Sequence, residues 1–456
     1  MINTKTFYDV GLGEYMYLGV LKNRTLYIDQ FTDESQKSEK NLECLIPKSL
    51  DDVFACFQPG KEKVALKRED GSAVLEKFIF QHLSDFDDDQ LISQSDTLKT
   101  LNDRKDMSTI AVQCLKENLC SIHEEIKVIE TAYRTLSLFF DNASPELDGS
   151  LSIMNVKSEG LCSSDSDETL SISKELERRN DSLSCKGRYG LLVIPGYLGE
   201  ASVVSMWAVI AHKYRTLLIS DFMDSPDYDT LITELRKAKL QDSDVFLANA
   251  VMTCNYITAS YKNDDNGNCN KLYLPASAAL AGRLANTDAI ISEGISDIEH
   301  GKLKSVNNTR INISETDAAA LTEMGLIVVT HQNDSVFPVS NRTLYSGCME
   351  FLKEYPLART ASWIRESIEY VIQQSVCCFN MSRRAINDLK QSIQDYLNEF
   401  KGSYEIIEDY NLERVEADPK ARNILVVVSL KFHNVLRPVR IEISGEYFMG
   451  WGYKFK

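Results

Sequence analysis

No part of this 456-residue sequence approaches the run of about 20 apolar residues that is needed to span a bilayer. The first residues, Met-Ile-Asn-Thr-Lys, are not followed by the apolar core of a secretory signal peptide. Apolar residues nevertheless make up 43% of the chain and charged residues 26%, which suits two or three domains with packed cores. We therefore expect a cytoplasmic protein that does not insert directly into a membrane.

Basic residues are scarce relative to acidic ones, with 50 Lys and Arg against 67 Asp and Glu and a formal net charge of -17. A protein that binds duplex nucleic acid needs a basic face to displace counterions. We therefore expect no nucleic acid among the partners. An acidic balance instead fits a soluble particle whose surface meets basic partners.

Patterns that bind metals are absent from the sequence. The 11 cysteines include no Cys-x-x-Cys pair, so buried free thiols in a reducing compartment are expected. The acids of residues 85–89 lack the spacing of an EF-hand loop. No histidine lies four residues from another, so packed or surface side chains are favoured over ligands. The six are His82, His123, His212, His300, His331 and His433. We expect no metal and no cofactor.

Motifs of catalysis are also missing. Ser202, Ser205, His212 and Asp221 are close in sequence, but Gly-x-Ser-x-Gly occurs nowhere. The segment Gly-Tyr-Leu-Gly at 196–199 stands between a predicted strand and helix, where a phosphate-binding loop would sit. It matches neither Gly-x-Gly-x-x-Gly nor the P-loop, and no lysine is ready to reach a phosphate. We therefore favour a structural turn over nucleotide binding and expect no enzyme.

Alternating strands and helices follow residue 187 and predict an α/β fold, with a mixed sheet flanked by helices. Strands are expected at 191–194, 216–219, 245–250 and 326–329, and helices at 203–212, 227–239 and 276–291. Ser314 and Asp317 form a capping box for one further helix. Residues 333–334 predict a turn.

The flanks of this region have patterns of their own. A small α+β unit is expected first, with a hairpin of residues 61–68 and 73–82 and helices at 50–57 and from Ser95 onward. An amphipathic helix covers 121–140, a strand follows at 151–156, and the Ser-rich residues 157–186 predict a polar loop or linker. Helices at 359–380 and 383–400 and strands at 404–415, 424–432 and 439–443 complete the chain.

The segment Ile-Leu-Val-Val-Val at 424–428 has high β-propensity. In a monomer it would be a central strand or an exposed edge. In an assembly it could pair across subunits by strand addition. Alternation selects Val426, Val428 and Leu430 for inter-subunit strand exchange. On that hypothesis Val428→Pro should block assembly and leave the protomer folded.

Several long blocks resemble the large sheath subunit, TssC, of Bacteroidetes type VI secretion systems. The first is GRYGLLVIPGYLG at 187–199, and the resemblance continues through VVSMWAVIAHK at 203–213. Further blocks lie at 221–222, 252–255, 274–282, 321–326, 341–345 and 418–420. The resemblance covers roughly residues 121–456.

The first part of the chain resembles the small sheath subunit, TssB. The blocks are DVFACFQP at 52–59, FQHLSDF at 80–86 and Gln-Ser at 94–95. The resemblance implies a TssB-like domain at 1–118 fused to a TssC-like domain at 119–456. Fusion would fix the two parts at one to one and make their docking intramolecular.

What the family implies is mechanical. Small and large subunits pair into protomers of a helical sheath, which contracts and propels an inner tube of Hcp-like protein. The implied partners are other sheath subunits, the inner tube, baseplate proteins and an AAA+ unfoldase. The long N-terminal stretch of the large subunit, to which unfoldase recognition is tied, has no counterpart here. The alternatives are a sheath-like adaptor at a baseplate or cap that does not polymerise, and an α/β nucleotide-binding enzyme.

Overall fold

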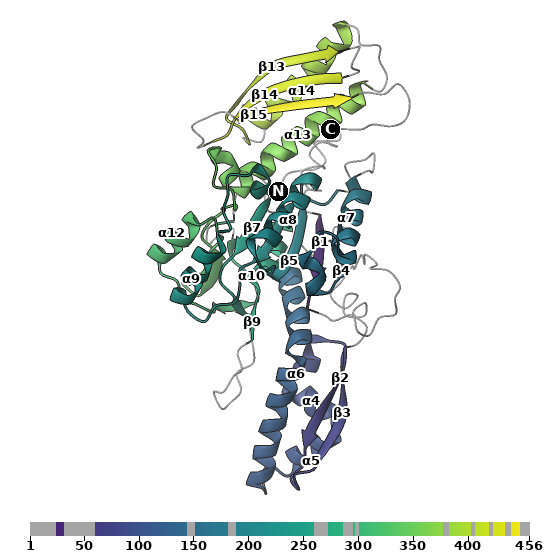
Figure 1. Ribbon diagram of the computed structural model, residues 1–456, viewed down its shortest axis with the longest axis vertical. Coiled ribbons are helices and arrows are strands. Elements are labelled where there is room, and N and C mark those ends of the chain that lie inside the picture. The colour runs from purple at the N-terminus through teal and green to yellow at the C-terminus, as the bar shows by residue number, and fades with distance from the viewer. Residues whose placement is uncertain are drawn as a thin grey trace.

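The structure is a computed structural model. It describes residues 24–31, 60–143, 151–180, 188–259, 272–285, 295–296, 301–376, 383–402, 406–418, 423–433 and 439–446. The helix expected at 50–57 lies outside these residues. Three parts follow one another along the long axis: a hairpin module, a central α/β layer and a C-terminal sheet with two helices (Figure 1).

A parallel five-stranded sheet forms the centre of the molecule. Its strands, in the order β4-β1-β5-β6-β7, are Leu151–Asn155, Thr25–Asp29, Leu191–Tyr197, Leu217–Asp221 and Ala250–Thr253. Every neighbouring pair runs parallel. Sheets of this kind are buried on both faces, which explains why the strands are apolar throughout rather than alternating.

Successive strand residues point to opposite faces, and helices cover both. Leu192, Ile194 and Leu218 pack with the side of the sheet that holds α8, Ala201–Tyr214, and α9, Tyr228–Ala238. On the other face Leu191, Val193 and Leu217 pack with α10, Ala276–Ala285, and the end of α6, Thr109–Asn142. The predicted α/β fold class with a helix-flanked sheet is confirmed, and the described strands of this sheet are all parallel where a mixed sheet was expected.

Shorter elements surround this layer. They are η3 Ser158–Cys162, α7 Asp167–Asn180, η5 Val245–Asn249, β8 Ile257–Ala259, β9 Tyr273–Leu274, β10 Val306–Thr309, α12 Glu315–Glu323, β11 Val329–Gln332, β12 Ser335–Pro338 and η6 Glu350–Lys353. The Ser314 side chain accepts from Asp317 N, as its capping box predicts. Asn333 and Asp334 adopt positive φ between β11 and β12, which confirms that turn.

Three predictions about local structure need correction. The strand expected at 245–250 is the 3-10 helix η5 followed by β7, which begins only at Ala250. The strand expected at 326–329 begins at Val329. Residues 157–186 contain η3 and α7 rather than only polar loop. The Ser-rich composition concealed α7, whose buried Ile172 and Leu176 follow the four-residue step of a helix.

The hairpin module lies at the end of the molecule opposite the C-terminal sheet (Figure 1). Strands β2, Gly60–Lys67, and β3, Ala73–Phe80, form the predicted hairpin. Helices η2 Leu83–Phe86, α4 Asp88–Gln94 and α5 Asp96–Asp103 follow, before the long α6. Val64, Leu66, Phe78 and Phe80 point inward and form a core with α6.

Helix α6 belongs to two cores. Ile122, Ile126 and Tyr133 pack in the hairpin module, whereas Leu136 and Phe139 pack under the central sheet. Residue 118, where the predicted small domain ends, lies inside this 34-residue helix. The predicted small domain also supplies β1, which pairs with β4 and β5. The hairpin module and the central layer are therefore joined by one continuous helix.

A partly buried ionic network fastens α6 to the start of α4. His123 Nε2 lies 2.8 Å from Asp88 Oδ1, and its Nδ1 lies 3.7 Å from Glu130 Oε2. Arg134 Nε donates to Glu130 at 2.8 Å. Burial disfavours the charged ring, but the hydrogen bonds and negative charges of Asp88 and Glu130 outweigh it and raise the pKa of His123 from 6.5 to about 9.

We expect the stability of the hairpin module to fall as pH rises from about 6.5 through about 9, because the charged ring is favoured in the folded state and its contribution is lost on deprotonation. The loss should reach about 1–3 kcal/mol, measured as unfolding free energy against pH. His123→Gln should flatten this profile, whereas His331→Gln should leave it unchanged. An equally steep profile in His123→Gln would assign the pH dependence to other groups.

The C-terminal sheet rests on two helices, α13 Tyr355–Val376 and α14 Arg383–Gly402. Its strands are β13 Asp409–Asp418, β14 Asn423–Lys431 and β15 Val439–Glu446, all antiparallel with β14 in the middle. None of the helices described is long and apolar enough to cross a membrane.

Candidate functional site

The residues that could have formed a hydrolase site are not brought together. His212 Nδ1 lies 2.8 Å from Asn249 Oδ1 near the amino ends of β6 and β7. Asp221 closes the carboxyl end of β6, at the opposite edge of the sheet. In the described ranges, no three His, Cys, Asp or Glu side chains gather as metal ligands would. The structure thus offers no catalytic constellation at these residues.

The loop at 196–199 forms hydrogen bonds within the protein at the place where a phosphate would bind. Gly196 N, the kind of backbone donor that a phosphate would take, donates to Asp221 Oδ2 at 2.8 Å. Gly196 has φ +98, and a Cβ there would lie 2.9 Å from Gln30 Nε2. Gln30 Nε2 in turn donates to Pro195 O at 2.6 Å. The loop is a tight strand-to-helix turn closed by Gln30 from the strand beside it.

Asp221 joins the carboxyl ends of strands β5, β6 and β7 to the amino end of helix α10. Its carboxylate accepts from Gly196 N, from Thr253 Oγ1, and from both N and Oγ of Ser277, the last N at 2.9 Å. The side chain is fully buried. Burial raises the pKa of Asp221, and these hydrogen bonds partly offset the rise. The cluster ties β5, β6, β7 and α10 together and leaves no donor for a ligand.

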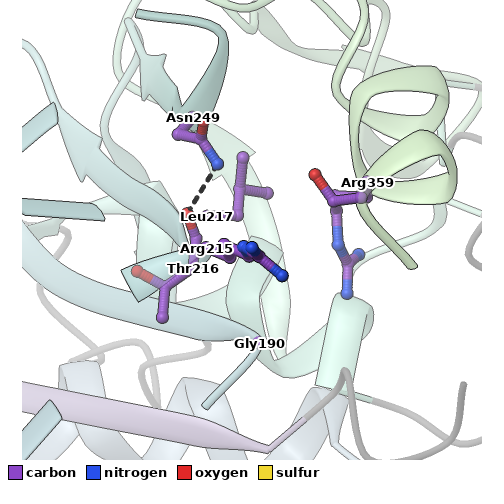
Figure 2. Close-up of a pocket in the computed structure, with 7 residues that line it drawn as sticks. Gly190, Arg215, Thr216, Leu217, Asn249 and Arg359 are labelled. Atoms are coloured by element: carbon purple, nitrogen blue, oxygen red, sulfur yellow. Dashed lines mark hydrogen bonds between the residues drawn. The ribbon is translucent and has the colours of Figure 1, made fainter. Parts of the chain in front are cut away.

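A cavity about the size of one water molecule lies where the C-terminal helices meet the central layer (Figure 2). Its lining includes Gly190, Thr216, Leu217 and Ser362. Figure 2 shows Arg215 and Arg359 on opposite sides, and Asn249 donating to Thr216 O, at 3.0 Å. Burial lowers the pKa of Arg359 to about 10. The cavity is far too small for a nucleotide.

An ion pair beside this cavity holds the C-terminal helices in place. Arg215, the αL cap of α8, donates to Glu369 of α13 from both terminal guanidinium nitrogens, Nη1 to Oε2 and Nη2 to Oε1, the latter at 3.0 Å. Arg365 Nε donates to the same oxygen at 3.2 Å. Glu369 is only 7% exposed. Two-pronged pairs of this kind fix orientation as well as proximity, so α13 is docked at a defined angle.

The residues chosen for strand exchange lie in the middle of the C-terminal sheet. Val426, Val428 and Leu430 are on one face of β14, fully buried against α13 and α14. Val428 pairs with Leu412 of β13 and Ile441 of β15. Exchange through these residues stays a prediction, since the structure contains one chain. The expectation that Val428→Pro leaves the protomer folded needs correction, because proline there would break a central ladder.

The two outer strands of this sheet differ in how their edges are protected. The pairing of β13 shifts between Leu412 and Arg414, so Glu413 is a bulge. A bulge and charged residues such as Glu413 and Glu416 blunt an edge against further pairing. The pairing of β15 with β14 is regular over Val439–Glu446. Of the two, β15 offers the better template for another strand.

Comparison with known proteins gives this architecture a family context. Residues 121–346 match the family model for the central domain of type VI secretion system TssC/VipB. Residues 121–346 thus resemble a sheath domain. The match covers just under half of the chain, from within α6 to the segment after β12. None of the curated proteins compared with the chain matches it.

Sheath proteins also appear among the similar solved structures. The sheath tail protein of Desulfitobacterium hafniense is 10% identical over 61% of this chain and 59% of its own, with a TM-score of 0.45. The sheath tail protein of Listeria innocua is 12% identical over 60% of this chain and 59% of its own, with a TM-score of 0.44. A chain of the anti-feeding prophage helical sheath in its contracted state is 15% identical over 68% of this chain and 80% of its own, with a TM-score of 0.48. This chain thus spans less than two thirds of the length of the two sheath tail proteins.

Proposed function

We propose that this chain is a structural protomer of a contractile type VI secretion sheath, which polymerises around an inner tube and contracts to propel it. The observation that carries the proposal is the TssC/VipB central-domain match over residues 121–346. The described part of the chain agrees with a mechanical role, because its buried polar cluster at Asp221 and its small cavity serve packing and not a ligand.

Strand addition at the C-terminal sheet is the proposed link between protomers. Val426, Val428 and Leu430 fix the central strand, and a strand from a neighbour extends the sheet at the regular edge of β15. Main-chain hydrogen bonds then provide affinity, and the buried valines provide a rigid base. The docking of α13 through Arg215 and Glu369 transmits load from this link to the central layer.

The finer features of the proposal come from the sequence resemblance. Residues 1–118 act as the small TssB-like part of a fused protomer of Bacteroidetes type in the cytoplasm. The inner tube is an Hcp-like protein, baseplate proteins are further partners, and an AAA+ unfoldase recycles contracted sheaths. Bistable contacts between protomers, and no chemical step, store and release the energy of contraction.

Negative-stain electron microscopy tests the proposal. We expect the purified chain at high concentration, with the cognate inner-tube protein, to form hollow tubes or stacked rings. Dispersed monomers with and without the tube protein would reject polymerisation and favour an adaptor at a baseplate or cap. Tight binding of any nucleotide in a ligand screen would instead favour an enzyme.

A further inference from the structure

The outer face of the hairpin module has an unusual composition for an acidic protein. Strand alternation turns Val64, Leu66, Phe78 and Phe80 inward, so the intervening residues face solvent. These exposed residues are Lys63, Ala65, Lys67, Ala73, Leu75, Lys77 and Ile79. They include three lysines and no acid, in a chain of net charge -17. The face is therefore basic where the molecule as a whole is acidic.

Two of these lysines are placed where their charges destabilise the hairpin. Lys63 is directly opposite Lys77 in the antiparallel register. Like charges opposite each other on one face of a sheet repel and destabilise the pair. Neither lysine has an ion-pair partner among the described residues. Lys67 differs, because its Nζ lies 3.5 Å from Glu117 of α6. The repulsion of Lys63 and Lys77 thus has no compensation within the described protomer.

Apolar side chains lie beside this pair. Leu75 is 63% exposed and faces Ala65 across the ladder, and Ile79 is 39% exposed. In a contact with an acidic surface, these exposed aliphatic residues would lose water and the lysines would meet opposite charges. The repulsion between Lys63 and Lys77 lowers the stability of the free chain, and no contact within the described protomer offsets it. Such a feature indicates a role in binding a partner.

We infer that the outer face of the hairpin, centred on Lys63, Leu75 and Lys77, docks on an acidic surface of a second copy of this chain. This inference rests on the proposed function. Charge complementarity selects the partner. The chain has 67 acidic and 50 basic residues, so another copy offers a surface with an excess of negative charge. Two lysines without ion-pair partners are attracted to such a surface.

The position of the face supports a second contact between protomers. It lies at the end of the molecule away from the C-terminal sheet (Figure 1). A single head-to-tail contact repeats along one line and builds a ring or a filament. A tube wall needs a second, independent direction of contact. Strand addition at one end and the hairpin at the other provide two separate directions.

Lys77→Glu tests the inference. It places a carboxylate opposite Lys63, which removes the repulsion in the free chain and half of the basic pair in the contact. We expect the critical concentration for tube assembly to rise at least tenfold, while the thermal midpoint of the free chain stays equal or rises. Lys105→Glu, an exposed lysine of the same module, should assemble like the wild type. A merely structural role of Lys77 would change stability and not assembly.

Zero-length carboxyl-to-amine cross-linking identifies the partner. In assemblies mixed from isotopically light and heavy chains, links from Lys63 and Lys77 should join acidic residues of different copies. Links that run only to the inner-tube protein, or only within one copy, would overturn the inference.

The outcomes separate the inference from the proposed function. Tubes of wild type and of Lys77→Glu at equal concentrations would overturn the hairpin contact and leave the sheath proposal standing. If the wild type forms no tubes, the sheath proposal fails, and sedimentation velocity at low and high salt decides the hairpin contact. Salt-sensitive self-association that Lys77→Glu abolishes would support the contact, and its absence would overturn it.

Discussion

Asp221→Ala is expected to lower the free energy of unfolding by about 3–5 kcal/mol, because each backbone donor that is stranded in the interior costs about 1–3 kcal/mol. Gly196 N and Ser277 N both end on this carboxylate. The Thr253 and Ser277 hydroxyls can rotate toward other groups, whereas the backbone fixes the direction of the two N–H groups. Thermal unfolding should show a midpoint about 3–5 °C lower, since the unfolding entropy of a chain this long is about 1 kcal/mol/K.

Two variants control this experiment. Ser220→Ala removes a neighbouring buried hydroxyl that has no hydrogen-bond partner in the described structure, so it should be nearly neutral. Asp221→Asn keeps the shape of the side chain, but its NH2 group faces hydrogen-bond donors of Gly196, Thr253 and Ser277. We therefore expect a smaller loss of unfolding free energy, of about 1–2 kcal/mol. If Asp221→Ala unfolds no earlier than Ser220→Ala, then the cluster does not hold the carboxyl ends of the strands together.

Gly282→Ala should also destabilise the protein, by about 1–3 kcal/mol, although alanine is the better helix former. A Cβ at Gly282 would lie 2.2 Å from Phe139 O of α6 and 3.0 Å from Asn142 Cβ. The obstacle is backbone, so α10 and α6 would have to move apart. Asn142 is itself held in place, because its Oδ1 accepts from Lys304 N at 2.7 Å.

Gly402→Ala is the matched control, since a Cβ at Gly402 meets nothing within 4 Å. The change should be neutral or stabilising by a few tenths of a kcal/mol. Chemical denaturation followed by tryptophan fluorescence reports on both variants, because buried Trp207 lies in the central layer and buried Trp363 lies in α13. Equal midpoints for the two alanine variants would mean that the close approach of α10 to α6 is not needed for stability.

Elements with a strong period or a cap could be predicted from the sequence alone. Strand β5, helix α8 and the Ser314 cap of α12 all lie where their patterns place them. Each depends on neighbours in sequence, either through the 3.6-residue period or through one side chain bonding a nearby backbone group. Such local signals survive without knowledge of the fold.

The rest depended on partners far away in sequence. Nothing near β1 indicates that Leu26 pairs beside Leu192, because parallel neighbours need long connections. Val428 posed a different problem, since high β-propensity is equally compatible with a central or an exchanged strand. Only its pairing with Leu412 and Ile441 reveals the middle position. The Lys63–Lys77 opposition likewise required the hairpin register.

Helix α6 makes the molecule a lever. At 1.5 Å per residue its 34 residues extend about 51 Å, and packing at both ends keeps them in line with two cores. If the central layer turns by about 15°, a size seen in rigid-body subunit rotations, the far end of the helix sweeps on the order of 10 Å. A modest turn near the sheet thus becomes a larger displacement at the hairpin, where Lys63 and Lys77 lie.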